Sequence, residues 1–192
     1  MIKTLTAKDA QQSALLHKQG MPNDFLPSFG ILFLTLLHQE LISNPRVIAL
    51  GEFNQDRLIG ILIATTNTSN TMRQIYLKNA FKFIFFVLKS LMQAPKKMSY
   101  LFQTLWYHNP TNINAEILIL TIDKKHRGKG IGSKLFRKLT QEYRARNISI
   151  ASVGTRKDNV IANAFYQKMG GSLESTYNIY DRVWNVYQYR LA

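Results

Sequence analysis

The run Arg-Gly-Lys-Gly-Ile-Gly-Ser at residues 127–133 is the part of the sequence whose residue types and spacing could bind an anion. It lies between an expected strand that ends at Ile122 and an amphipathic helix expected over residues 130–146. The first amides of a helix have no intrahelical partner and the helix dipole leaves partial positive charge there, so a phosphate is stabilised at that end. Glycines let a phosphate approach the backbone closely, and Arg127 and Lys129 add full positive charges. The run therefore predicts a phosphate-binding turn.

The spacing within this run excludes two common nucleotide motifs. A P-loop needs glycine followed by Lys and then Ser or Thr, whereas Gly132 is followed directly by Ser133. The dinucleotide fingerprint G-x-G-x-x-G also fails, because the glycines run G-x-G-x-G and the unit lies late in the chain. Taken alone, the run could still be a glycine-rich turn with no ligand.

Hydrophobic periodicity predicts the elements that must position this turn. In the C-terminal half it predicts strands over residues 116–122, 148–153, 172–180 and 183–191, and helices over 130–146 and 159–169. In the N-terminal half it predicts a strand over 2–6, helices over 9–18 and 31–42, a turn and loop over 21–30, and a hairpin of strands 47–53 and 58–65. This order indicates an α/β (α+β) fold, a mixed sheet with helices packed on it.

The segment 66–114, between the hairpin and the strand at residue 116, is expected to carry a helical insertion over about 72–108 that builds a binding pocket. It is expected to contain a loop over 66–71, a helix over 75–92, a second helical piece over 97–106 and a loop over 108–114. Three lysines interrupt the apolar run, which falls short of the roughly 20 apolar residues of a membrane span. No transmembrane span is expected, but a basic amphipathic helix also suits a membrane surface. Core packing of its aromatics is the simpler interpretation.

The bulk composition limits the class of protein. A chain of 192 residues with 46% hydrophobic residues is expected to form one domain over residues 1–192, as a monomer or homodimer. The absence of cysteine excludes disulfides, thiolate metal sites and cysteine nucleophiles, no metal site is expected, and the cytoplasm is the expected location. The formal charge of +14 favours anionic ligands without choosing among them. No nucleic-acid motif is visible, so nucleic acid is not the expected partner.

Three segments, in the same order, resemble the GCN5-related N-acetyltransferase (GNAT) superfamily. Its cofactor motif is Arg or Gln, two residues, Gly, one residue, then Gly or Ala, and Arg127, Gly130 and Gly132 occupy these places. Residues 115–123 look like its fourth strand, and residues 159–170 look like its N-x-x-A-x-x-x-Y-x-x-x-G helix. The clear match covers about residues 115–171, and a weaker one covers 47–65. The resemblance implies a mixed, mostly antiparallel central sheet flanked by helices.

The resemblance implies acetyl-CoA as the cofactor, wedged between the strands at 116–122 and 148–153 as they splay apart. An exposed strand edge can bond the amide groups of the acetyl-pantetheine arm as though they were another strand. Backbone groups near Leu120, Thr121 and Ile122 would take this role. The pyrophosphate would be held by Arg127, Gly128, Lys129, Gly130, Ile131, Gly132 and Ser133.

Tyr166 occupies the position of the family's usual general acid, which protonates the departing coenzyme A thiolate. Asn159, Asn163 and Tyr166 are spaced i, i+4 and i+7, so they share one helical face, which can look at the cofactor. An aryl hydroxyl with a pKa of about 10 can donate to a thiolate and stays protonated at neutral pH. The alternative is a core tyrosine whose hydroxyl is satisfied.

The acceptor amine must lose a proton before it attacks, because an amine of pKa near 10 is mostly ammonium at neutral pH. Glu116, on the strand approaching the thioester, is the first candidate for the base, although a strand-end carboxylate can equally be a solvated charge. His108 and His126 are the next candidates.

Two departures from the family pattern are visible. Several members carry a glutamate base on the fifth strand, but residues 149–154 contain no acidic residue, so that role cannot be transferred. After Gly170 the family commonly has an aromatic residue, and this chain has Gly171.

The expected function is transfer of an acetyl group from acetyl-CoA to a primary amine of a small molecule, by direct attack in a ternary complex. Residues 25–34 look similar to superfamily members associated with bacterial amino-sugar and surface-glycan pathways, which makes an amino sugar the first acceptor to consider. A protein or peptide amine, or a non-catalytic acyl-CoA-binding module, are the alternatives.

Overall fold

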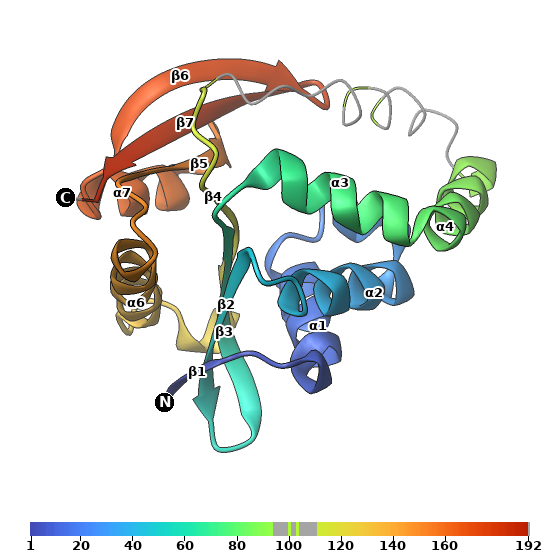
Figure 1. The fold of residues 1–192 in the computed structure, drawn as a ribbon, viewed down its shortest axis with the longest axis horizontal. Coiled ribbons are helices and arrows are strands. Elements are labelled where there is room, and N and C mark those ends of the chain that lie inside the picture. The colour runs from blue at the N-terminus through green and yellow to red at the C-terminus, as the bar shows by residue number, and fades with distance from the viewer. Residues whose placement is uncertain (94–99, 101–102, 104–110, 192) are drawn as a thin grey trace.

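The computed structural model describes residues 1–93, 100, 103 and 111–191. These build a seven-stranded sheet in the order β1-β2-β3-β4-β5-β7-β6, with helices on both faces (Figure 1). All the neighbouring strands are antiparallel except β4 and β5, which are parallel. The predicted fold class, a mixed and mostly antiparallel sheet flanked by helices, is confirmed.

The strands and helices occur in the predicted order, and most of their bounds lie within a few residues of the predicted ones. The strands are β1 (Ile2–Thr4), β2 (Val47–Asn54), β3 (Arg57–Thr65), β4 (Glu116–Ile122), β5 (Ile150–Arg156), β6 (Ser172–Ile179) and β7 (Arg182–Arg190). The helices are α1 (Ala10–Gly20), α2 (Ile31–Ile42), α3 (Thr68–Lys78), α4 (Ala80–Gln93), α6 (Ile131–Ala145) and α7 (Val160–Lys168). Short 3-10 turns are η1 (Ala7–Asp9), η2 (Leu26–Phe29) and η3 (Lys124–His126).

The parallel strands β4 and β5 pair over a short distance and then separate. Their ladder consists of Glu116 opposite Ser152 and Ile117 opposite Val153. Beyond these pairs each strand stays paired on its other side, β4 with β3 and β5 with β7. The facing edges of β4 and β5 are therefore open from residue 118 and residue 154 onward, which is the splay that the resemblance implied.

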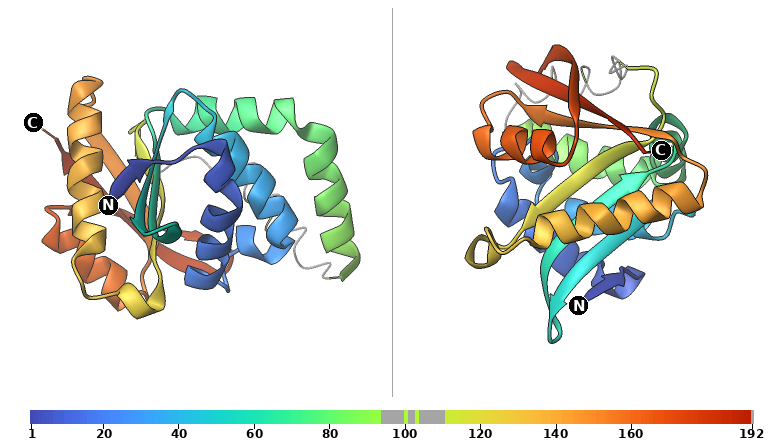
Figure 2. Two further views of the ribbon diagram at one scale, coloured as in Figure 1. Left: turned by 90° about the horizontal axis from the view of Figure 1, so that it is seen from below. Right: turned by 90° about the vertical axis from the view of Figure 1, so that its left-hand side faces the viewer.

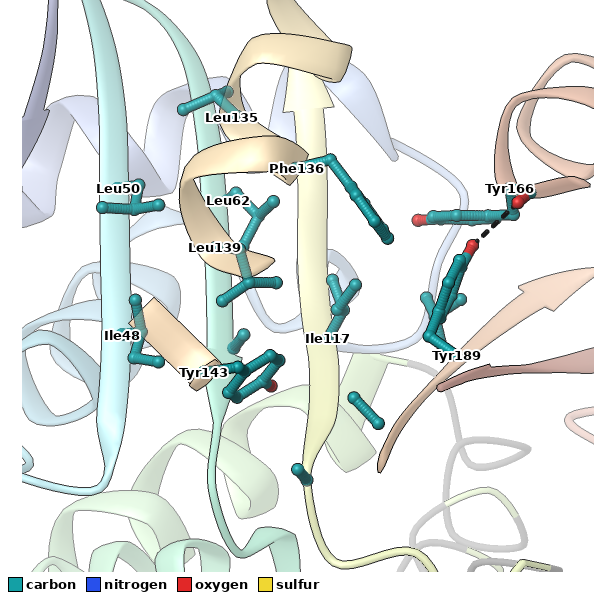
Figure 3. Close-up of a cluster of buried hydrophobic side chains, with 14 of the residues drawn as sticks. Ile48, Leu50, Leu62, Ile117, Leu135, Phe136, Leu139, Tyr143, Tyr166 and Tyr189 are labelled. Carbon is teal, nitrogen blue, oxygen red and sulfur yellow. Dashed lines mark hydrogen bonds between the residues drawn. The ribbon is translucent and has the colours of Figure 1, made fainter. Parts of the chain in front are cut away.

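Helix α6 covers one face of the sheet and connects the two parallel strands. Its buried residues recur at helical spacing and face strand residues that include Ile48, Leu50, Leu62 and Ile117 (Figure 3). The buried hydroxyl of Tyr143 donates to the backbone oxygen of Thr65 at 3.0 Å. This packing fixes where α6 begins, and therefore where the turn at 127–133 lies.

The opposite face of the sheet carries α1, α2 and α3, and α4 stands farther out, packed against α3 and η2 (Figure 2). Leu34, Leu37 and Leu41 of α2 pack with Ile61 and Ile63 of β3 in a second buried cluster. Strands β2 and β3 are therefore buried on both faces over most of their length.

The insertion differs from the prediction in two places. Residues 66–71 were expected to be a loop, but α3 begins at Thr68, because the side chain of Asn67 accepts a hydrogen bond from the amide of Asn70 at 3.0 Å and caps the helix. The single helix expected over 75–92 is two helices that meet at Asn79. The side-chain amide of this residue donates to the backbone oxygen of Ile75 at 3.2 Å, and such local bonds compete with a continuous helix.

Several expectations for residues 97–114 lie largely outside the described residues. These are all but two residues of the second helical piece at 97–106, residues 108–110 of the loop at 108–114, and the candidate base His108. Among the helices that the structure does describe, none is both long enough and apolar enough to cross a membrane.

Candidate active site

A cavity of about 440 Å³ lies between the end of β4, the start of α6 and α7. We call it the turn cavity. Most of the residues predicted to bind the cofactor line it, namely Leu120, Thr121, Ile122, Arg127, Gly128, Gly130, Ile131, Gly132, Ser133, Asn159 and Tyr166. Lys129, from the same run, is exposed and does not line this cavity.

The backbone of the turn needs glycine at two positions. Gly128 and Gly130 have φ values of 76° and 75°, in the left-handed region that L side chains rarely adopt. Gly130 stands immediately before α6, so the amides that follow it have no intrahelical partner and carry the positive end of the helix dipole. This arrangement suits a phosphate.

Polar contacts fix residues 122–127, which lead from β4 into the turn. Arg127 Nε donates to the backbone oxygen of Ile122 at 3.0 Å, which folds the side chain back along the end of β4. The carboxylate of Asp123 accepts from the amide of Lys125 at 3.1 Å and from Arg57 at 2.9 Å. The hydrogen bond from Lys125 lowers the pKa of Asp123, so this anchor stays ionised.

A second cavity, of about 360 Å³, occupies the splay between β4 and β5. We call it the splay cavity. Its walls include residues 117–120 of β4 and 153–156 of β5, the connection between α1 and α2, and residues Met72 and Tyr76 of α3. The two cavities share Leu120, Asn159 and Tyr166 as lining residues, so they meet at α7.

Tyr166 stands at this junction and is 6% exposed. Its backbone oxygen accepts a hydrogen bond from the hydroxyl of Tyr189 at 2.9 Å, as Figure 3 shows. Its own hydroxyl makes no hydrogen bond to any of the residues that the structure describes. Burial raises the pKa of this hydroxyl, so it stays protonated and free to donate.

The side chain of Asn163 is used within the protein. Its Nδ2 donates to the backbone oxygens of Arg156 at 2.9 Å and Asn159 at 2.7 Å. Its Oδ1 accepts from the hydroxyl of Tyr187 at 2.9 Å and from Asn185 at 2.7 Å. Asn163 lines neither cavity. It was predicted to contact the cofactor, whereas in the structure its side chain holds α7 against β5 and β7.

Asn159 does line both cavities. Its Oδ1 accepts from the amide of Ala162 at 3.1 Å, so it also caps α7. Of the three residues expected to share one face, Asn159 and Tyr166 therefore reach the site, and Asn163 supports them.

Glu116, the predicted base, lies at the paired end of β4 and lines neither cavity. Its Oε2 accepts a hydrogen bond from Thr68 Oγ1 at 2.9 Å. Burial raises the pKa of its carboxyl, and the bond from Thr68 opposes that rise. His126, the other described candidate, lines the turn cavity, with Nδ1 3.4 Å from Asp123 Oδ2.

The structure brings a different carboxylate, Asp24, to the wall of the splay cavity. Its Oδ1 is 3.7 Å from Arg156 Nη1 and 4.0 Å from Arg182 Nη1, which is longer than a hydrogen bond. Burial raises the pKa of Asp24, and the two arginines oppose the rise. No sequence signal marked this residue, because it lies in an irregular loop without periodicity or motif.

Trp184 lines the same cavity. Its indole Nε1 is buried and has no hydrogen-bond partner among the described residues. An unpaired buried donor is costly, so this atom is suited to a polar group of a bound molecule.

His17 also lines the splay cavity and is hydrogen-bonded through Nδ1 to His38 Nε2 at 3.0 Å. Burial lowers the pKa of His17 to about 4, so the ring is neutral at physiological pH. Within the described residues, no group of three or more His, Asp or Glu side chains could hold a metal ion.

A family model described as the acetyltransferase (GNAT) family matches residues 20–171, which is more than half of the chain. The chain belongs to this family. This GNAT protein is therefore an acyl-CoA-dependent N-acetyltransferase with acetyl-CoA as its cofactor, as the sequence predicted.

The uncharacterized protein YxbD of Bacillus subtilis (strain 168) is 41% identical to this GNAT protein over 56 residues. That match covers 29% of this chain and 35% of YxbD.

Solved structures extend the likeness to the whole chain. The N-acetyltransferase from Staphylococcus aureus Mu50 superposes with a TM-score of 0.66 at 13% identity, covering 100% of this chain and 98% of that one. An aminoglycoside 6'-N-acetyltransferase complexed with coenzyme A gives 0.63 at 15% identity, with coverage of 100% and 97%. The ribosomal-protein-S18-alanine N-acetyltransferase from Escherichia coli gives 0.62 at 11% identity, with coverage of 100% and 94%. At these identities the likeness shows the fold.

Proposed function

We propose that this GNAT protein transfers an acetyl group from acetyl-CoA to the primary amine of a small molecule, by direct attack in a ternary complex. The observation that carries the proposal is the hydroxyl of Tyr166, which is buried, protonated and unpaired within the described residues. It lies where a cavity suited to a phosphate meets a cavity with open strand edges. A donor and an acceptor could therefore reach it from opposite sides.

The residues of both cavities fit coenzyme A. The turn cavity offers helix amides, Arg127 and left-handed glycines to a pyrophosphate. The open edge of β4 near Leu120, Thr121 and Ile122 offers backbone groups to the amides of the pantetheine arm. When bound, acetyl-CoA supplies a thioester that an amine can attack.

Tyr166 would act as the general acid. It would give its hydroxyl proton to the sulfur that leaves as the new amide bond forms. A buried phenol stays protonated over the whole physiological range, so it is available for this step, and Asn163 would keep α7 in place for it.

Two carboxylates are candidates for the base that takes the proton of the acceptor amine. Glu116 was predicted from the sequence, but its carboxylate bonds Thr68 away from the cavities. Asp24 lines the splay cavity and makes long ion pairs that leave room for an ammonium donor. The geometry therefore favours Asp24 as the residue that holds the acceptor amine and takes its proton.

The test of Tyr166 is thiol release from acetyl-CoA, measured with a panel of amines that includes amino sugars, amino acids and peptides. Tyr166→Phe should lower kcat by about 100-fold or more, the usual contribution of a general acid. Tyr143→Phe is the matched control, since it removes a buried tyrosine hydroxyl outside both cavities. If Tyr166→Phe keeps full kcat with an accepted amine, the general-acid role is wrong. If no amine raises thiol release, the protein is a binding module for acyl-CoA.

The test of Asp24 is the steady-state KM for the amine. Asp24→Asn should weaken the acceptor by about 10-fold to 100-fold, because a hydrogen bond to a charged group is lost. Asp56→Asn, at an exposed position in the β2–β3 turn, is the control. If Glu116→Gln produces the loss and Asp24→Asn does not, the base predicted from the sequence is the correct one.

A further inference from the structure

Helix α4 carries apolar side chains on two opposite sides. On the inner side Phe83 is 7% exposed, and its ring centroid lies 5.3 Å from that of Phe33. On the outer side four large apolar residues at helical spacing are largely exposed, namely Phe81 at 92%, Ile84 at 54%, Phe85 at 63% and Leu88 at 57%. With Leu77 at the end of α3, which is 69% exposed, we call these residues the outer stripe.

The outer stripe differs from the other exposed apolar residues of the described chain. Elsewhere the exposed large apolar side chains are aliphatic, whereas two phenylalanines are exposed here. A helix that is apolar all round is normally buried on all sides, and a contiguous exposed apolar patch marks a site of interaction. Something is therefore expected to cover this side of α4.

The charge beside the stripe indicates what kind of surface covers it. From Thr68 to Gln93 the sequence contains no Asp or Glu, but it contains Arg73, Lys78, Lys82 and Lys89. Of these, Lys78 is paired with Glu40 of α2 at 2.8 Å, so it adds no net charge there. Lys82 is exposed and is one residue from Phe81, at the flank of the stripe. Apolar side chains flanked by lysines match the acyl boundary and anionic headgroups of a lipid surface.

A second copy of the chain is a poorer match. A two-fold interface places the same patch of both subunits together, so the lysines of one copy would meet the lysines of the other. No acidic residue of α3 or α4 would offset that repulsion.

The position of α4 also suits contact with a surface. It forms one end of the molecule, and α6 lies at the opposite end, in two views of the ribbon (Figures 1 and 2). Docking through α4 would therefore leave the turn cavity open to the cofactor. Met72 and Tyr76 of α3, the helix next to α4, line the splay cavity, so the acceptor side would lie nearer the surface.

We propose that the outer stripe docks this GNAT protein onto an anionic lipid surface, with Phe81 and Phe85 inserted and Lys82 against the headgroups. The proposal stands on α4 and the end of α3, and does not depend on the acceptor or on the acid proposed above.

The experiment is co-sedimentation of the full chain with vesicles of phosphatidylcholine alone, or of phosphatidylcholine containing phosphatidylglycerol. We expect binding to the anionic vesicles only, and weaker binding at high salt. Replacing both phenylalanines, Phe81→Ser with Phe85→Ser, should reduce binding by about tenfold or more, since apolar insertion is lost. Lys82→Glu should also reduce it.

Matched controls are Val160→Ser with Leu173→Ser, two exposed apolar residues on α7 and β6, and Lys8→Glu, an exposed lysine near the N-terminus. These should bind as the unaltered chain does. All the replaced side chains are exposed, so the thermal unfolding temperature should stay unchanged, and Lys82→Glu tests the proposal independently of the phenylalanine pair.

Three results would overturn the proposal. These are no binding to anionic vesicles, control variants that lose as much vesicle binding as the α4 variants, or vesicle binding that neither α4 variant reduces. A sedimentation-velocity experiment in the absence of lipid tests the alternative, in which a second copy of the chain covers the stripe. If the chain is a dimer that the phenylalanine replacements dissociate, a second copy covers the stripe and the lipid assignment is wrong.

Discussion

Acid should destabilise this protein through two histidines, His17 of α1 and His38 of α2, that are buried where the two helices pack together. His17 and His38 are 3% and 0% exposed. They share a hydrogen bond, and His38 Nδ1 lies 2.8 Å from Ser13 Oγ. Burial lowers the pKa of His17 to about 4 and, together with the nearby His17, lowers the pKa of His38 to about 3. The folded protein therefore keeps both rings neutral.

The sign and size of the effect follow from linkage. In the unfolded chain a histidine has a pKa of about 6.5, so below that pH the unfolded state binds protons that the folded state does not. The free energy of unfolding is thus unaffected well above pH 6.5 and falls as the pH drops toward the folded pKa values. At pH 5 each ring costs about 2 kcal/mol, and the pair on the order of 4 kcal/mol, against a typical total of about 5–15 kcal/mol.

Urea unfolding at pH 5, 6, 7 and 8 measures this cost in the unaltered chain and in the double variant His17→Gln with His38→Gln. The variant should lose about 4 kcal/mol less than the unaltered chain between pH 8 and pH 5, whatever its stability at pH 8. Proton NMR of the imidazole rings gives the folded pKa values directly. Equal pH slopes for the two proteins, or a ring that titrates near pH 6.5 in the folded state, would refute the reasoning.

Two glycine substitutions test the turn and the end of α7. Gly130→Ala should cost about 1–2 kcal/mol of coenzyme A binding by calorimetry, because φ is 75° there, while Gly132→Ala, outside the left-handed region, is the control. Equal losses would show that backbone conformation is not what the turn needs. Gly171→Ala should cost about 1–3 kcal/mol of stability, because a Cβ would lie 2.8 Å from the Tyr189 hydroxyl and 2.9 Å from the Tyr166 oxygen. An unchanged melting temperature would contradict it.

The parts of the fold that the sequence predicted well are those governed by local signals. The bounds of α2 and β4 agree with the prediction, since α2 ends just before Asn44-Pro45 and β4 is a short run of Ile and Leu. The turn at 127–133 was recognisable because its glycines are required by the local backbone.

The acceptor side could not be predicted in the same way. Asp24, Tyr76, Arg156 and Trp184 lie far apart in the sequence and meet only when α1, α3, β5 and β7 have packed together. Glu116, the base predicted from the sequence, lines neither cavity, and this could not be seen in the sequence, since strand membership does not tell which end of a splay a side chain occupies.

Gly171 shows how a departure from a family pattern can be compensated elsewhere in the chain. The resemblance predicted an aromatic residue there, and with glycine in its place the sequence did not show how the segment beside Tyr166, the proposed general acid, is packed. In the structure Tyr189, from β7, stands over that glycine, and its hydroxyl bonds the backbone oxygen of Tyr166. An aromatic ring is thus present in this place but comes from another strand. The Tyr189 hydroxyl bonds the main chain of Tyr166, so it does not occupy the side-chain hydroxyl of the proposed general acid, which lies at the junction of the two cavities.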